Sequence, residues 1–187
     1  ASMVITSTVQ EVEEQYALYE RYQPERMEVV PPGVDLTGFR EKAMKPYQKG
    51  GVVERVESFL EDPKKPIILA IARADHRKNL VALVDAYGRS EDLREMANLV
   101  IIAGNRDDIL QAEPGQRRVI SDILMHVDQH DLYGKAAYPK QHDPDEVSQL
   151  YRWAAETGGV FVNPAFTEPF GLTLLEAGTL GLPVVAT

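Results

Sequence analysis

The chain contains no cysteine among its 187 residues. This absence excludes a disulfide framework and a thiolate metal site, and it fits a reducing compartment, so we expect a cytoplasmic protein. Long hydrophobic runs are also missing, since no segment approaches the roughly 18 apolar residues of a membrane-spanning helix. The first residues, Ala1-Ser2-Met3, lack the basic flank and apolar core of a signal peptide. We therefore expect no membrane association.

Basic residues are in deficit. Lys and Arg together number 20 against 29 Asp and Glu, which gives a net charge of −9. This balance argues against a general nucleic-acid surface, so an anionic ligand needs a local cluster of cations. With 44% hydrophobic residues, the chain is long enough for one sizeable core or for a domain plus part of another.

Apolar runs alternate with helical patterns over most of the chain. Continuous apolar runs are typical of strands covered on both faces, and strand-helix alternation predicts an α/β fold with a doubly wound, Rossmann-like parallel sheet. The runs are 67–71, 99–102, 159–162 and 183–186, with a weaker strand at 135–138. The predicted helices lie at 52–60, 80–87, 119–127 and 147–154.

The first 35 residues have a different pattern. Strand-like runs at 3–6 and 27–30 enclose a polar helix that Ser7-Thr8 caps and that extends to about Tyr22. The following Pro31-Pro32-Gly33 stops both helix and sheet, so we expect a hinge or linker there. Because the chain opens almost inside a strand and stops within another, we also expect a fragment of a larger protein.

Two carboxylates, Glu168 and Glu176, lie eight residues apart across the start of a predicted helix. The strand end, the loop and the free N–H groups of the helix make a place for a phosphate, and each carboxylate can accept hydrogen bonds from sugar hydroxyls. This layout is the one expected for a nucleotide-sugar. In the alternative interpretation, Glu168 complements the helix dipole and Glu176 is solvated. The apolar neighbours of Glu176 weigh against this alternative, because a carboxylate there needs a partner.

A second candidate lies in the loop after the first long apolar run, where Arg73, Arg77 and Lys78 precede a helix. These cations are suited to hold a diphosphate and to neutralise charge on a leaving group. They could instead be a solvated group that balances Asp75 and Asp85, an interpretation that fits Arg77 best. Loops at 104–108, 139–142 and 163–171 also follow predicted strands, so all four loops should converge.

A metal site has weaker support in the sequence than the nucleotide-sugar site. Adjacent Asp107 and Asp108 could bind Mg²⁺, but they could equally cap the following helix or pair with Arg106. No His/Asp/Glu cluster has ligand spacing, so we expect no required cofactor and no metal site, with Mg²⁺ possible but without an identifiable motif. His142 lies in a strand-end loop, and we expect it to be structural.

The motifs at 71–79, 104–108, 137–140 and 161–177 resemble, in the same order, those of the retaining glycosyltransferases with two Rossmann-like domains (GT-B class, family 4). The resemblance is strongest to the sucrose-phosphate synthases. The similar sucrose synthases usually carry Ala at the position of Pro169 and lack the string Gly-Asn-Arg-Asp-Asp found at 104–108.

The resemblance implies a reaction and two domains. Glucose would pass from UDP-glucose to fructose 6-phosphate with retention, giving sucrose 6-phosphate. Residues 1–35 would be the tail end of the acceptor domain plus the hinge, and 36–187 the UDP-sugar-binding domain, incomplete at its C-terminus. The acceptor site would lie mostly outside this chain, so the chain alone should bind donor at most weakly and show no turnover.

The resemblance also implies residue roles. Arg73 and Lys78 would hold the diphosphate and, with Glu168, form the catalytic group, while Glu176 would bind the ribose hydroxyls. The remaining implied contacts are glucose at Glu168, Phe170 and Gly171, phosphate at the backbone N–H groups of Leu172 and Thr173, and uracil at the main chain of the loop that holds Tyr138 and Lys140.

Two alternatives stay open. One is a sucrose synthase or another family 4 retaining glycosyltransferase, which would differ in acceptor. The other, of a different class, is a non-catalytic Rossmann-like domain used for interaction or regulation.

Overall fold

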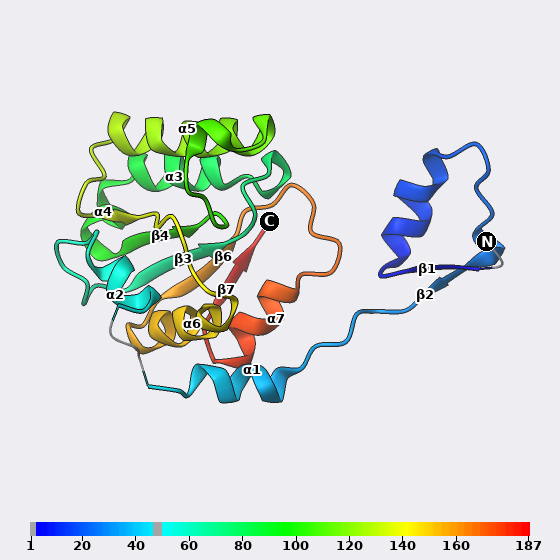
Figure 1. The fold of residues 1–187 in the computed structure, drawn as a ribbon, viewed down its shortest axis with the longest axis horizontal. Helices are drawn as coiled ribbons and strands as arrows, with labels where there is room; N and C mark the ends of the chain where they lie inside the picture. The colour runs from blue at the N-terminus through cyan, green and yellow to red at the C-terminus, as the bar shows by residue number, and fades with distance from the viewer. Residues whose placement is uncertain (1–2, 47–49) are drawn as a thin grey trace.

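A five-stranded sheet in the order β5-β4-β3-β6-β7 forms the centre of the protein (Figure 1). The computed structural model describes residues 3–46 and 50–187. The strands are β3 (Ile67–Ile71), β4 (Asn98–Ile102), β5 (Ala136–Ala137), β6 (Val160–Asn163) and β7 (Val184–Ala186). Every neighbouring pair is parallel, which confirms the predicted α/β fold with a doubly wound sheet.

The strand order reverses at β3. From β3 the chain runs through β4 and β5 to one edge, and it then returns to the other side of β3 with β6 and β7. In open parallel sheets, ligands bind outside the carboxyl ends of the strands at such a reversal. The loops that follow β3 and β6 flank this crevice, so the topology favours these two of the four strand-end loops.

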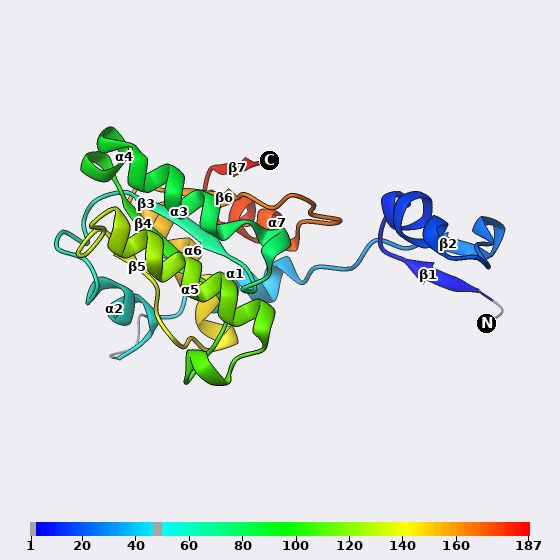
Figure 2. The same ribbon diagram turned by 90° about the horizontal axis from the view of Figure 1, so that it is seen from above.

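Helices cover both faces of the sheet (Figures 1 and 2). One face carries α3 (Leu80–Arg89) and α5 (Pro114–Gln129), and the other carries α2 (Val52–Glu57), α6 (Val147–Glu156) and α7 (Leu172–Thr179), while α4 (Glu91–Met96) leads into β4. Successive residues of β3 enter opposite cores: Ile67 and Leu69 join the cluster under α6, and Ile68 and Ala70 join the cluster under α3 and α5. Burial on both faces is why the strands are continuously apolar.

Helix α1 (Leu36–Ala43) forms in a stretch where the sequence analysis predicted no helix. The carboxylate of Asp35 caps it by accepting the Gly38 N–H at 2.9 Å. Ala43 is fully buried, and the ring of Phe39 packs edge-on against Tyr151 at 5.8 Å between centroids. Packing of a few residues against α6 therefore stabilises a helix that the amino-acid composition does not reveal.

The predicted polar helix from Thr8 to Tyr22 is wrong in its extent. Thr8 does accept the Glu11 N–H, at 3.2 Å, but the helical turns end at Leu18 and Tyr19 is extended. Val12 is the one buried residue of these turns, so they have almost no apolar face to pack. The turns are η1 (Glu11–Gln15) and η2 (Tyr16–Leu18), followed by η3 (Pro24–Arg26).

The N-terminal residues form a separate small unit. Strand β1 (Val4–Thr6) pairs in parallel with β2 (Met27–Val29), and an extended segment joins this unit to α1 (Figures 1 and 2). The division at residue 35 and the role assigned to 1–35 stay predictions. Ala1, Ser2 and 47–49, which that division includes, lie outside the described residues.

Three short turns complete the described chain: η4 (His76–Lys78), η5 (Ile109–Gln111) and η6 (Pro144–Glu146). Among the described helices, none combines the length and the apolar character that crossing a bilayer requires.

Gly159, just before β6, lies in close contact with the main chains of β3 and α6. A Cβ at this position would lie 2.2 Å from the carbonyl oxygen of Ile67 and 2.8 Å from that of Ala154. These are main-chain atoms of β3 and α6, so they cannot move aside without disturbing both elements.

We expect Gly159→Ala to lower the free energy of unfolding by about 1–3 kcal/mol, because the added methyl group forces β3 and α6 apart. Urea denaturation followed by circular dichroism measures the change. Gly115→Ala is the matched control, since nothing lies within 4 Å of the new methyl group on α5. Equal stability of the two variants would contradict the close crossing at Gly159.

Candidate functional site

The loops after β3 and β6 meet at the strand-order reversal. The main-chain N–H of Phe166 donates to the carbonyl of Arg77 at 2.9 Å, and the rings of His76 and Phe166 lie 5.5 Å apart. A cavity of about 290 Å³ lies between the two loops and the start of α7. Its lining residues are Arg73, Arg77, Lys78, Thr167, Glu168, Pro169, Phe170, Gly171, Leu172 and Thr173.

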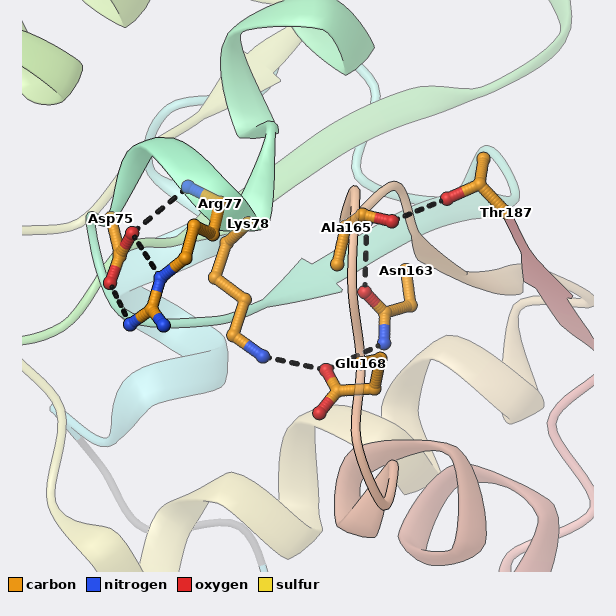
Figure 3. Close-up of polar contacts among 7 residues, drawn as sticks. All are labelled: Asp75, Arg77, Lys78, Asn163, Ala165, Glu168 and Thr187. Atoms are coloured by element: carbon orange, nitrogen blue, oxygen red, sulfur yellow. Dashed lines mark hydrogen bonds and ion pairs between the residues drawn. The ribbon is translucent and has the colours of Figure 1, made fainter. Parts of the chain in front are cut away.

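An ion pair crosses this cavity. Lys78 Nζ lies 2.6 Å from Glu168 Oε2, and both side chains are about one-fifth exposed, at 21% and 22% (Figure 3). Asn163 Nδ2 donates to the same carboxylate oxygen at 3.0 Å. Burial would raise the pKa of Glu168, but the hydrogen bonds from Lys78 and Asn163 outweigh it, so the pKa lies below its ordinary value. Glu168 is therefore a fixed, ionised acceptor.

The amino end of α7 also opens onto the cavity. Gly171 precedes the helix with φ at +78°, a left-handed conformation that favours glycine. The N–H groups of Leu174 and Leu175 both donate to the Gly171 carbonyl. Those of Leu172 and Thr173, as the first two of the helix, have no acceptor within it and provide an anion-binding end.

The two arginines of the β3 loop differ. Arg77 is engaged by Asp75, with Nη2 at 2.9 Å from Oδ2, and its hydrogen bonds lower the pKa of Asp75 to about 2. Arg73 is exposed and makes no ion pair or side-chain hydrogen bond within the part of the chain that the structure describes. Arg77 is thus balanced by a carboxylate of its own loop, as the alternative interpretation proposed for it. Lys78 instead pairs with Glu168 across the cavity, so Arg73 and Lys78 stay the candidate ligand-binding cations.

Glu176 lies at a neighbouring cavity rather than at the one with Arg73 and Lys78. This second cavity, of about 400 Å³, lies between α7, α1 and the loop before α6, and Lys42 and His142 also line it. Tyr151 Oη donates to Glu176 Oε2 at 3.3 Å. Burial raises the pKa of Glu176, and the bond from Tyr151 offsets part of that increase. Helix α7 therefore presents its amino end to one cavity and its second turn to the next.

The loops after β4 and β5 are bound to each other. Arg106 donates from its side chain to the carbonyls of Tyr138 and Pro139, at 2.9 and 3.2 Å, and from its main chain to the carbonyl of Lys140 at 2.9 Å. Tyr138 packs against Phe59, with ring centroids 5.1 Å apart, and Lys140 is exposed. The four strand-end loops therefore form two pairs, and the residues that line the cavity between the β3 and β6 loops include none from the loops after β4 and β5.

Asp107 and Asp108 have structural partners. Asp108 Oδ1 accepts the Leu110 N–H at 2.9 Å and so caps η5, and Asp107 accepts a hydrogen bond from Gln141. The predicted alternative of pairing with Arg106 is not seen, because that guanidinium donates to main-chain carbonyls instead. Among the described residues, no group of three or more His, Asp and Glu side chains could hold a metal ion.

The sequence analysis assigned no role to Asn163. This residue ends β6 with its side chain buried and bonded to Glu168. The available signal was an amide as the final residue of an otherwise apolar strand, directly before the loop that carries the acid.

We expect Lys78→Met to raise the pKa of Glu168 and to lower the free energy of unfolding at pH 7 by about 2 kcal/mol, because the partly buried carboxylate loses its cation. The pKa of Glu168 in the folded protein is depressed. The ion pair therefore stabilises fully above the unfolded pKa, and its effect is lost as pH falls through the folded pKa. Urea denaturation at pH 7 and pH 3 measures the loss of stability and its dependence on pH.

Lys42→Met is the control for this prediction, since it breaks an ion pair with Asp145 whose side chains are 47% and 70% exposed. It should change stability little at either pH. A Lys78→Met loss that is as large at pH 3 as at pH 7 would contradict the charge-based explanation.

Comparison with known proteins identifies the family of the chain. Residues 52–187 match the family model described as "Glycosyl transferases group 1". The chain is 42% identical to sucrose-phosphate synthase 4 of Arabidopsis thaliana and 41% identical to the sucrose-phosphate synthase of Zea mays, with 100% of this chain but 21% of each relative covered.

A solved structure is similar throughout the chain. The sucrose-phosphate synthase of Thermosynechococcus elongatus superposes with a TM-score of 0.68 at 26% identity, over 100% of this chain and 40% of that one. The resemblance predicted from the sequence motifs is thereby confirmed. By the match over 52–187, the chain belongs to the group 1 glycosyl transferases.

Proposed function

We propose that this chain is the donor-binding part of a retaining glucosyltransferase that transfers glucose from UDP-glucose to fructose 6-phosphate, giving sucrose 6-phosphate. One observation carries the proposal. At the strand-order reversal, three cationic side chains, the amino end of a helix and an ionised carboxylate line a single cavity. The names of the relatives support the choice of donor and acceptor.

The polar groups of the cavity match the parts of a nucleotide-sugar. Arg73, Lys78 and the N–H groups of Leu172 and Thr173 are suited to the diphosphate, because each supplies positive charge or a free donor. Glu168 is suited to glucose hydroxyls, since its ionised carboxylate accepts hydrogen bonds and Lys78 holds it in place.

The remaining contacts belong to the rest of the donor. Phe170 and Gly171 border the position of glucose beside Glu168. Glu176, one turn further along α7, is assigned to the ribose hydroxyls and would reach them from the neighbouring cavity. The main chain near Tyr138 and Lys140 is assigned to uracil. The same proposal assigns residues 1–35 to the end of an acceptor domain and gives the protein a cytoplasmic location.

Catalysis in this proposal is electrostatic and positional. Arg73, Lys78 and the amino end of α7 stabilise the negative charge that develops on the leaving diphosphate. An oxygen of that diphosphate takes the proton of the acceptor hydroxyl on the same face of the sugar, so the protein need not supply a nucleophile. Loss of one such cation should raise the barrier by about 3 kcal/mol.

The donor assignment predicts different effects for the two acids. Glu176→Ala should weaken binding of UDP about tenfold, and Glu168→Ala should weaken UDP-glucose relative to UDP by a similar factor, because each removes a charged hydrogen-bond acceptor from one sugar. Isothermal titration calorimetry with both ligands measures this. Unchanged affinities in both variants would overturn the carboxylate assignments. No binding of UDP at millimolar concentration to the folded chain would favour the non-catalytic alternative.

The acceptor assignment needs the protein with its acceptor-binding part, because this chain spans 21% of the length of the relatives. We expect transfer of glucose to fructose 6-phosphate and strong discrimination against fructose, since a site with unpaired cations binds the bare sugar poorly. Product formation from radiolabelled UDP-glucose measures both acceptors. Equal or preferred use of fructose would favour a sucrose synthase.

A further inference from the structure

Asn163 is a buried amide in a position that requires explanation. It is the last residue of β6, pairs in register with Ala186 of β7, and is 7% exposed. An amide in such a place destabilises the fold unless both its ends are hydrogen-bonded. The sheet needs no polar group there, since every other residue of β6 is apolar.

Both ends of this amide are used, and both bonds go to the same loop (Figure 3). Its Oδ1 accepts the main-chain N–H of Ala165 at 3.2 Å, and its Nδ2 donates to Glu168 Oε2 at 3.0 Å. The carbonyl of Ala165 in turn accepts from Thr187 Oγ1 at 2.7 Å. The loop from β6 to Glu168 is therefore attached at its start and at its end to one rigid side chain.

We infer that Asn163 is a positioning residue for Glu168: by bonding Ala165 with one end and the carboxylate with the other, it holds Glu168 in the orientation that binds the sugar of the donor. Asn163 does not itself line the cavity. The inference rests on the proposed donor site and assigns to it a residue that controls recognition of glucose rather than of diphosphate.

Lys78 alone cannot orient the carboxylate in this way. Its ammonium group is at the end of a flexible stem with several rotatable bonds, whereas Asn163 is short and is anchored in the sheet. An amide also offers a donor to Glu168 and an acceptor to Ala165 from two different atoms, whereas the hydroxyl of Ser or Thr has a single oxygen for both bonds. An isosteric carboxyl would keep the bond to Ala165 but would place a second negative charge against Glu168.

Asn163→Asp is therefore the sharpest test. At pH 7.5 we expect about a tenfold loss of affinity for UDP-glucose, with affinity for UDP within twofold of the wild type. Lowering the pH to 5.5 should restore binding of UDP-glucose in the variant but not change it in the wild type. The two adjacent carboxyls then share a proton, and the shared proton replaces the lost amide donor.

The charged groups that face this pair are Lys78, at 2.6 Å from Glu168, and Arg73 and Arg77, which line the same cavity. All three are present in the wild type as well as in the variant. A pH effect confined to the variant therefore reports the new carboxyl pair. Carbon-13 NMR of labelled glutamate carboxyls gives a second readout, in which the pKa of Glu168 should rise in Asn163→Asp.

Asn98→Asp is the matched control. Asn98 is also a buried strand amide, 2% exposed, but it is the first residue of β4 and donates to the carbonyl of Asp62, at the edge of the sheet opposite to the cavity. This control should lower stability without changing the ratio of UDP-glucose to UDP affinity at either pH. Asn163→Ser, which adds no charge, tests the same point if Asn163→Asp does not fold, with about a fivefold selective loss expected.

An equal loss of UDP and UDP-glucose affinity in the Asn163 variants, or an unchanged pKa of Glu168, would overturn the inference and leave Asn163 with a structural role. Failure of the proposed function has a different result: the wild type would bind neither ligand. The NMR titration would then still decide whether Asn163 controls the carboxylate.

Discussion

The ion pair between Lys78 and Glu168 connects the two halves of the sheet. Lys78 follows β3 and Glu168 follows β6, so the pair forms only because the strand order places β6 beside β3. The partly buried carboxylate would be costly without its cation. The ion pair thus holds both charged groups at the cavity between the two loops.

The distribution of charge follows from the same constraint. In a chain of net charge −9, three cations of the loop after β3 line one cavity, and the amino end of α7 supports them without adding a side-chain charge. Other charges are used locally, as Arg77 by Asp75 and Arg106 by main-chain carbonyls. The positive charge at this cavity therefore comes from a few positions rather than from the average surface.

Much of the fold was predictable because both faces of the sheet are covered. The apolar runs of β3, β4 and β6 identified the strands, and the amphipathic periods of α3, α5 and α6 identified the helices between them. Two elements were not predictable in this way. Helix α1 depends on Ala43 and Phe39 packing against α6, and the first helical turns end early because Val12 is their one buried residue.

The sequence by itself determined the α/β fold and the family of the chain, because buried strands are read from continuous apolar runs and the motifs that follow them keep their order along the chain. It also predicted the chemical groups of the candidate site, since loops after buried strands carry the polar residues. It could not determine which loops meet. Only the tertiary structure decided that the β3 loop joins the β6 loop, that Glu176 faces a different cavity, and that Asn163 bonds Glu168. The physical reason is that strand order and side-chain direction arise from packing between residues far apart in the chain, which local patterns do not record.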